Sequence, residues 1–316
     1  MTERQVRAVD GFRLAYDRTG AGHPVVLLHG WPGDRHDYRA VTDLLRDRAD
    51  VIVPDLRGFG ESDKHDMDPV EQYDVAAQAR SVVALMDELE VDQVVLAGYD
   101  VGGRVAREVA ERHPDRVGYL VLSPPLPGVR SRILDPDTQR EYWYQAFHQL
   151  PLVEQTLDGR SDAVRAYLSY FWNHWTGPDF SPDEAEIDRL TDIYAISGAL
   201  VASVNYYRAG AGAVNTALHE TPPKRNARIA TPTIVLWPGT DALIRREWAD
   251  HLEDYFAELE LRVVGCGHFT PVEAPDDFAA AVLDAVTARS SASNHLTPAA
   301  AKMTAATGPG SVTGDR

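Results

Sequence analysis

Short apolar runs alternate with helical patterns through the first half of this chain, and that alternation is the strongest constraint on its fold. Four runs read as strands: Val25–Leu28, Val51–Pro54, Val94–Ala97 and Tyr119–Leu122. Helical patterns such as Val75–Leu89 lie between them. Apolar strands that alternate with helices are typical of a parallel, doubly wound sheet buried on both faces. Functional sites in such sheets form at the carboxyl ends of the strands.

The strand signal disappears from about residue 124 to residue 227, where aromatic side chains become dense. This region is bounded by two proline pairs, Pro124-Pro125 and Pro222-Pro223, and we interpret it as an inserted helical cap. The alternation then resumes with Thr233–Leu236 and Leu261–Val264, followed by an amphipathic helix over about 276–288. We therefore predict an α/β core at 1–126 and 227–289, and a helical cap at 127–226.

The last part of the chain, 290–316, consists largely of Ser, Ala, Thr, Gly and Pro. Such a composition lacks the apolar side chains that would offset the entropy of ordering. We predict a disordered tail there.

The charge balance excludes several classes of partner. The 316 residues include 31 Lys and Arg against 48 Asp and Glu, a formal net charge of −17. Binding to nucleic acid or to an anionic membrane surface needs clustered positive charge, so we expect neither partner. No apolar run approaches the roughly 20 residues of a membrane helix. The single cysteine, Cys266, excludes an internal disulfide, and the first residues do not resemble a signal peptide, so we expect a cytoplasmic protein.

The segment Gly98-Tyr99-Asp100-Val101-Gly102 follows a predicted strand and begins a predicted helix. Its glycine spacing is typical of a nucleophile elbow, a sharp turn that tolerates only small neighbours. An isolated aspartate there would be explained as a helix N-cap. The flanking strand and helix, with the partners described next, favour Asp100 as a nucleophile. A carboxylate attacks saturated carbon that bears a leaving group or a strained ring, and an alkyl-enzyme ester results.

Hydrolysis of such an ester needs an activated water. His268 lies in a turn after the last predicted strand, and Asp241 follows the strand before it. The chain order nucleophile, acid, histidine is that of a known hydrolase template. We predict that Asp241 orients His268, which takes a proton from water. The backbone amides of Trp31 and Val101 are the predicted donors to the oxyanion.

The motifs HGWPG, DLRGFGESD, GYDVGG, PGTDALI and GCGHFTPVEAP together closely resemble the α/β-hydrolase family, over about residues 6–288. This resemblance implies the α/β-hydrolase fold, a mostly parallel doubly wound sheet with an inserted helical cap. The aspartate in the elbow narrows it to epoxide hydrolases, haloalkane dehalogenases and fluoroacetate dehalogenases. No metal or organic cofactor is implied.

Residues after the nucleophile separate these groups. Haloalkane dehalogenases usually carry a halide-binding tryptophan there, whereas this chain has Val101. Fluoroacetate dehalogenases resemble D-R-G-x-R, in which two arginines hold the substrate carboxylate. This chain has only the second, Arg104. Without the first arginine, the chain lacks one of the two groups that could bind a substrate carboxylate through paired hydrogen bonds. Small haloacids are therefore less favoured as substrates.

Epoxide hydrolases use a pair of cap tyrosines to protonate the opening ring. The segment YQAFHQLP resembles the family's first such segment and places Tyr144 in that role. For the second tyrosine of the pair, Tyr207 lies where the dehalogenase-like branch of the family has its cap tyrosine. The mammalian-like branch has its equivalent near Thr191, with Tyr194 one turn further along. We choose Tyr207 and keep Tyr194 as a substrate contact.

The resulting hypothesis is an epoxide hydrolase that forms a vicinal diol from a small, apolar or aromatic substrate; a homodimer is compatible with it. The alternative is a dehalogenase in which Trp143, Tyr142 and Tyr207 bind the halide and Arg104 binds a carboxylate. A second alternative, from a different class, is a non-catalytic ligand-binding protein on the same fold. The Asp100, Asp241 and His268 set argues against it.

Overall fold

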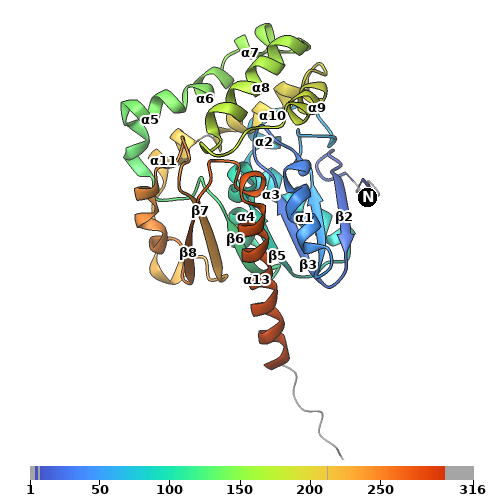
Figure 1. Ribbon diagram of the computed structural model, residues 1–316, viewed down its shortest axis with the longest axis vertical. Helices are drawn as coiled ribbons and strands as arrows, with labels where there is room; N and C mark the ends of the chain where they lie inside the picture. The colour runs from blue at the N-terminus through green and yellow to red at the C-terminus, as the bar shows by residue number, and fades with distance from the viewer. Residues whose placement is uncertain (1–3, 6–7, 212, 296–316) are drawn as a thin grey trace, which may run out of the picture.

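In the computed structural model, residues 4–5, 8–211 and 213–295 are described, and an eight-stranded sheet lies at the centre (Figure 1). The strand order is β1-β2-β4-β3-β5-β6-β7-β8. Every neighbouring pair from β4 to β8 is parallel, and β1 and β2 are antiparallel to their neighbours. The strands are β1 (Arg4–Gln5), β2 (Ala15–Gly20), β3 (His23–Leu28), β4 (Ala49–Pro54), β5 (Val94–Gly98), β6 (Val117–Leu122), β7 (Thr233–Pro238) and β8 (Leu259–Val264).

The predicted parallel, doubly wound sheet is confirmed. Every residue of β4, β5 and β7 is buried, because helices cover both faces of the sheet. The antiparallel strand β2 was not predicted. Its second half, Asp17–Gly20, is polar and partly exposed near the edge of the sheet, so it lacks the apolar run that marks the central strands.

Two layers of helices enclose the sheet (Figure 1). On one face, α3 (Val75–Glu88) packs against α4 (Asp100–Arg112). On the other, α1 (Arg39–Leu45) packs against α13 (Pro275–His295). The short helical turns outside these layers are η1 (Arg35–Tyr38), α2 (Pro69–Gln72), η2 (Arg130–Leu134), η4 (Arg225–Ala227), η5 (Arg246–Asp254) and α12 (Thr270–Glu273). None of the described helices is both long and apolar enough to cross a membrane.

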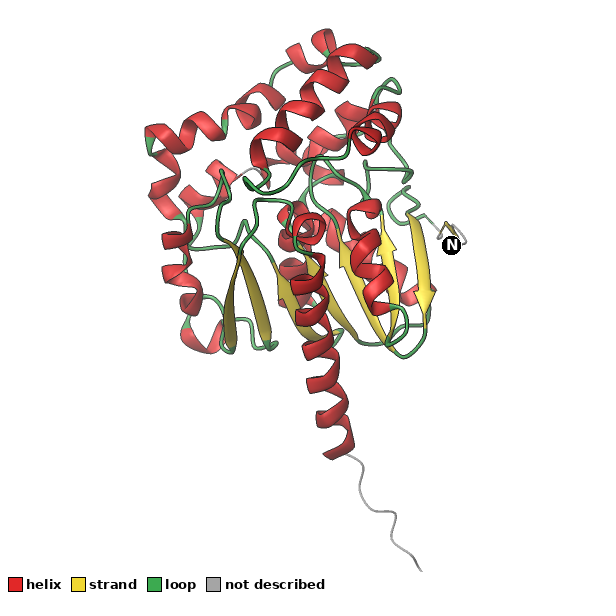
Figure 2. Cartoon of the chain, viewed as in Figure 1, coloured by secondary structure: helices red, strands yellow, loops and turns green. Residues whose placement is uncertain are grey.

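The remaining helices all lie between β6 and β7 in the sequence, where we expect the cap. They lie across the carboxyl ends of the strands (Figure 2). They are α5 (Pro136–Glu141), α6 (Trp143–His148), α7 (Leu152–Thr156), α8 (Ser161–Trp175), α9 (Glu184–Tyr194), α10 (Ala199–Tyr206), the π-helical η3 (Tyr207–Ala211) and α11 (Ala213–His219). The cap therefore covers the edge of the sheet at which the predicted site residues are found.

The last helix is longer than predicted. We expected order to end near Ser290, but α13 continues to His295. The extra residues are mostly serine and alanine, without a glycine or proline that would stop a helix. The rest of the predicted tail, 296–316, lies outside the described residues.

Buried polar contacts attach the cap to the core. Arg189 of α9 donates two hydrogen bonds, of 2.7 and 2.9 Å, to the fully buried carboxylate of Asp34. The backbone amide of His268 donates to the carbonyl of Trp175, at the end of α8, over 2.9 Å. The loop that carries His268 is therefore bonded directly to the cap.

Gly267 makes this junction possible. A Cβ atom there would lie 2.2 Å from the amide nitrogen of Gly177 and 2.5 Å from the carbonyl oxygen of Trp175. At Gly265, two residues earlier, a Cβ atom would meet nothing within 4 Å. The two positions thus form a matched pair for testing the junction.

We expect Gly267→Ala to lower the free energy of unfolding by about 1–3 kcal/mol, the usual cost of overpacking. Gly265→Ala should leave it nearly unchanged. The measurement is urea denaturation of both variants beside the wild type. Equal stabilities of the two variants would contradict the close approach.

Candidate active site

The nucleophile elbow predicted from the sequence is a strained turn between β5 and α4. Asp100 has a φ of +49°, in the left-handed region that non-glycine residues rarely adopt. A Cβ atom at Gly102 would lie 2.0 Å from the carbonyl oxygen of Leu28, and one at Gly98 would lie 2.5 Å from the backbone of Gly102. Both glycines are therefore needed for the backbone to turn this sharply, and the turn directs Asp100 out of the sheet.

Backbone amides hold the Asp100 carboxylate. The Trp31 amide donates to Oδ1 over 2.8 Å, and the Val101 amide also bonds the carboxylate. Burial raises the pKa of Asp100, but the bond and charge of His268 and these two amides outweigh burial and hold it below its ordinary value. The carboxylate is thus ionised at neutral pH. The residues predicted to form the oxyanion hole lie against the predicted nucleophile.

His268 and Asp241 also lie together, after β8 and β7. His268 Nδ1 lies 2.9 Å from Asp241 Oδ2, and the Leu243 amide donates to Asp241 Oδ1 over 2.7 Å. His268 Nε2 lies 3.5 Å from Asp100 Oδ2. One imidazole therefore stands between two buried carboxylates, with its two nitrogens facing different partners.

This position sets the charge of the imidazole. Burial lowers the pKa of His268, but the carboxylates of Asp241 and Asp100 outweigh burial and raise it to about 10. The resting site therefore holds a cationic imidazole between two anions. It can act as a base only after one of those negative charges is removed.

The two predicted cap tyrosines face the same cavity as Asp100. Their rings meet edge to face, with centroids 5.7 Å apart, Tyr144 from α6 and Tyr207 from the start of η3. The empty space of this cavity, counted together with the solvent open to it, is about 310 Å³. Its lining residues are Asp100, Val101, Arg104, Pro125, Tyr142, Tyr144, Gln145, Tyr206, Tyr207, Leu243, Ile244 and His268. Burial and the nearby negative charge of Asp100 raise the pKa of both cap tyrosines above its ordinary value, so both remain proton donors.

Two of the predicted substrate contacts lie elsewhere. Trp143 is 39% exposed and packs its ring on Phe171 outside the cavity, because it occupies the helix face opposite Tyr144. Tyr194 is fully buried, and its hydroxyl donates to the carbonyl of Gly33 over 2.7 Å. Neither Trp143 nor Tyr194 lines the cavity around Asp100. Tyr194 instead fastens α9 to the loop that carries Trp31.

Sequence reasoning missed three residues of the site. Tyr206 and Gln145 line the cavity, and the Gln145 amide donates to the Tyr144 hydroxyl over 3.0 Å. Neither carries a signal in the sequence beyond its place beside a chosen tyrosine. Glu273 accepts from the backbone amides of Gly177, Gly267 and Phe269 at 2.7–3.0 Å. It fixes the His268 loop, and its place in the GCGHFTPVEAP motif could have indicated it.

Two other buried histidines, His29 and His148, have partners outside the predicted triad. His29 accepts the Leu56 amide at Nε2 over 3.0 Å, which joins two loops of the core. His148 lies behind the cap tyrosines, bonded to Tyr167 over 2.9 Å, and burial lowers its pKa to about 3. Within the described residues, no group of three or more His, Cys, Asp or Glu side chains is placed to hold a metal ion.

Comparison with known proteins identifies the family. Residues 23–275 match the model of a family described as the alpha/beta hydrolase fold. The chain belongs to this family. A soluble epoxide hydrolase from Corynebacterium sp. (strain C12) is 28% identical, with 84% of this chain and 91% of that protein covered.

A fluoroacetate dehalogenase from Burkholderia sp. is 29% identical, with 82% of this chain and 86% of that protein covered. Among solved structures, one described among novel epoxide hydrolases in metagenomes from hot environments is 26% identical. It has a TM-score of 0.75, with 90% of this chain and 98% of that chain covered. Both epoxide and carbon–halogen chemistry are thus represented among proteins of similar sequence.

We expect His268 to titrate near pH 10 in the resting protein rather than near its ordinary 6.5. Because the folded-state pKa is raised, its contribution to folding stability is complete below about pH 6.5 and is lost as the pH rises through about 10. The measurement is NMR titration of the ring, with Asp241→Asn expected to lower the pKa. A wild-type titration between pH 6 and 7 would contradict this charge arrangement.

Proposed function

We propose that this protein is an epoxide hydrolase that opens an epoxide to a vicinal diol through an ester on Asp100. The observation that carries the proposal is the cavity in which an ionised carboxylate faces two protonated tyrosines, Tyr144 and Tyr207. An epoxide needs both at once, a nucleophile at carbon and a proton donor at oxygen.

The positions of the two carboxylate oxygens suggest how Asp100 acts. Oδ1 accepts the amide of Trp31, whereas Oδ2 faces His268 and the cavity. In the first step, Oδ2 bonds to a ring carbon, the carbon–oxygen bond breaks, and the released alkoxide takes a proton from Tyr144 or Tyr207. The product of this step is a neutral ester of Asp100.

Ester formation activates the base. It removes the negative charge that Asp100 contributes to the raised pKa of His268, so that pKa falls. The imidazolium then gives up its proton, and the tyrosinate left by the first step regains one. The neutral His268, still oriented by Asp241, takes a proton from water, and the water oxygen bonds to the carbonyl carbon of the ester. The oxyanion forms on Oδ1, beside the amides of Trp31 and Val101. Collapse of this intermediate breaks the bond between the carbonyl carbon and the alkyl oxygen, and the His268 imidazolium gives its proton to that oxygen, which yields the diol and the Asp100 carboxylate.

The relatives support this proposal and one alternative. Two of the three proteins compared above are described as epoxide hydrolases. The fluoroacetate dehalogenase supports the alternative, carbon–halogen cleavage by the same proposed residues. Arg104 lines the cavity, and its positive charge would favour a haloacid as the substrate of such a reaction. Val101, in the place of the expected halide-binding tryptophan, weighs against a haloalkane.

We expect a His268→Gln variant to accumulate the ester, because ester formation no longer leads to hydrolysis. Incubation with styrene oxide should increase its intact mass by that of the whole epoxide. A second substitution, Asp100→Ala, should abolish the increase. An increase of chloroacetate minus hydrogen chloride, without an epoxide adduct, would favour the dehalogenase. No adduct with either would favour the non-catalytic alternative.

We expect Tyr144→Phe and Tyr207→Phe each to slow ester formation by about 10²–10⁴-fold, the usual contribution of a general acid. The measurement is the rate of adduct formation in the His268→Gln background. Tyr170→Phe is the control, because Tyr170 is 43% exposed on the outer face of the cap. Full rates in both cavity variants would contradict the proton-donor role.

A further inference from the structure

Strand β8 forms one edge of the sheet. In the described part of the chain it pairs with β7 alone, in an unbroken parallel register. An edge strand presents a row of unpaired backbone N–H and C=O groups, which proteins usually protect with lysine, proline, a bulge or a very short strand. β8 is six residues long and contains neither lysine nor proline. Its outer edge therefore has none of these protections.

The backbone groups of alternate residues of β8 face away from β7. The carbonyl of Val264 accepts the amide of Gly239, directly after β7, over 2.8 Å. The N–H and C=O groups of successive residues point to opposite sides of a strand, so the even-numbered residues of β8 bond β7. The odd-numbered residues direct their backbone groups outward: Leu259, Leu261 and Val263.

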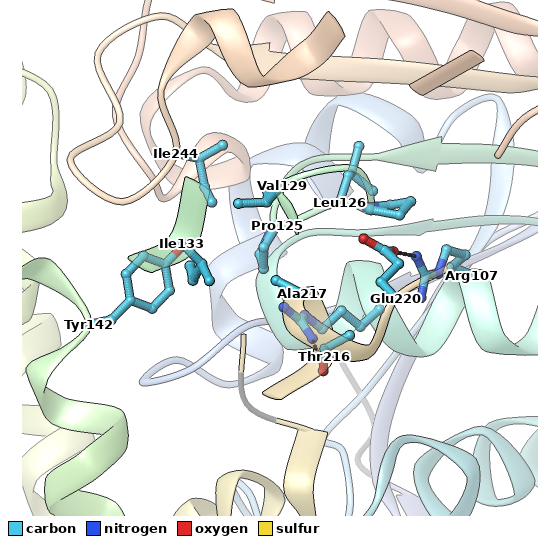
Figure 3. A pocket seen from close by; sticks show the side chains of 12 residues that line it. Arg107, Pro125, Leu126, Val129, Ile133, Tyr142, Thr216, Ala217, Glu220 and Ile244 are labelled. Atoms are coloured by element: carbon cyan, nitrogen blue, oxygen red, sulfur yellow. Dashed lines mark hydrogen bonds and ion pairs between the residues drawn. The ribbon is translucent and has the colours of Figure 1, made fainter. Parts of the chain in front are cut away.

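Two apolar side chains of β8 are uncovered. Leu261 and Val263 are 43% and 47% exposed. The segment after β6 differs, because its apolar side chains Val129 and Ile133 are buried beside α11 (Figure 3). Burial of exposed apolar area is favourable, so a strand added at the edge of β8 would gain stability by covering these two side chains.

The charges of β8 match a second copy of the same strand. Glu260 and Arg262 flank Leu261. When two β8 strands run antiparallel with Leu261 opposite Leu261, each Glu260 lies opposite the Arg262 of the other copy. A slide of two residues in either direction places Glu260 opposite Glu260, or Arg262 opposite Arg262. Because like charges directly opposite destabilise a strand pair, the sequence of β8 favours one register of self-pairing.

This pairing keeps the ion pairs that Arg262 already makes. Its Nε donates to Glu260 over 2.7 Å, and its Nη1 lies 2.9 Å from Asp284 of α13. A guanidinium has five N–H donors, so donors remain for a second carboxylate. In the paired strands each Glu260 has one Arg262 beside it on its own strand and another across from it. The four charges therefore alternate in sign.

We propose that the protein forms a two-fold symmetric dimer in which two antiparallel β8 strands join both sheets into one. The outward backbone groups of Leu261 bond those of Leu261 in the other copy, and Leu259 pairs with Val263. Their side chains lie together on the face away from α13, because Arg262 occupies the α13 face. Six residues from each copy make a small interface, so the dimer is weak, with a dissociation constant in the micromolar range. The proposal does not depend on the reaction that the protein catalyses.

Reversal of single charges tests the register. We expect Glu260→Arg and Arg262→Glu each to dimerise at least tenfold more weakly than the wild type, measured by sedimentation equilibrium, because like charges then face each other. An equimolar mixture of the two variants should recover the dimer, since every facing pair again has opposite charges. Asp192→Arg is the control and should dimerise as the wild type does, because Asp192 is exposed on α9, at the other side of the molecule (Figure 1).

A backbone substitution tests the strand pairing itself. Leu261→Pro removes an outward N–H without removing a bond to β7, so it should abolish the dimer and leave cooperative unfolding of the monomer intact. Three outcomes would overturn the proposal. They are a wild type that stays monomeric up to hundreds of micromolar, a dimer that persists in Leu261→Pro, and a mixture of the two charge variants that does not recover the dimer.

Discussion

A buried carboxylate must be compensated, and the groups that compensate Asp100 connect the loops at this edge of the sheet. Burying an ionised group without partners costs several kcal/mol, so such groups are paired and hydrogen-bonded. Here two backbone amides and the imidazole of His268 stabilise the charge of Asp100, and Asp241 stabilises the charge of the imidazole. These partners come from the loops after β3, β5, β7 and β8, so the parallel sheet brings them to one edge.

Trp31 links this compensation to the cap. Its backbone amide bonds Asp100, while its indole ring lies parallel to the ring of Tyr144 at 5.7 Å and meets Tyr207 edge to face at 5.8 Å. The indole nitrogen also donates to Ser203 of α10 over 3.2 Å. One residue therefore contacts Asp100 through its backbone and the cap tyrosines Tyr144 and Tyr207 through its side chain, which joins the two halves of the proposed site.

The sequence predicted the core of the fold better than the cap. Apolar runs identify β3 to β7 because those strands are largely buried. β8 also carries an apolar run although it is mostly exposed, whereas the second half of β2 is polar and that strand was missed. Around Asp100 and His268 the glycine spacing is visible because the backbone needs those glycines. Within the cap, the depth of each aromatic depends on helix rotation and packing. Adjacent Trp143 and Tyr144 consequently differ, one exposed and one lining the cavity, and nothing in their order predicts it.

The junction at Gly267 has a consequence for exchanging caps between related enzymes. His268 is bonded through its amide to Trp175, and Glu273 spans Gly177 and Gly267. His268, the proposed base, is thus bonded to the end of α8, whereas Asp100, the proposed nucleophile, is held at the end of β5. In a transplanted cap, the segment that corresponds to 175–177 could have a different backbone path. His268 would then be displaced relative to the ester on Asp100. Such a chimera would still be alkylated but would turn over slowly, so modular recombination in this scaffold must carry the 175–177 segment together with its host loop.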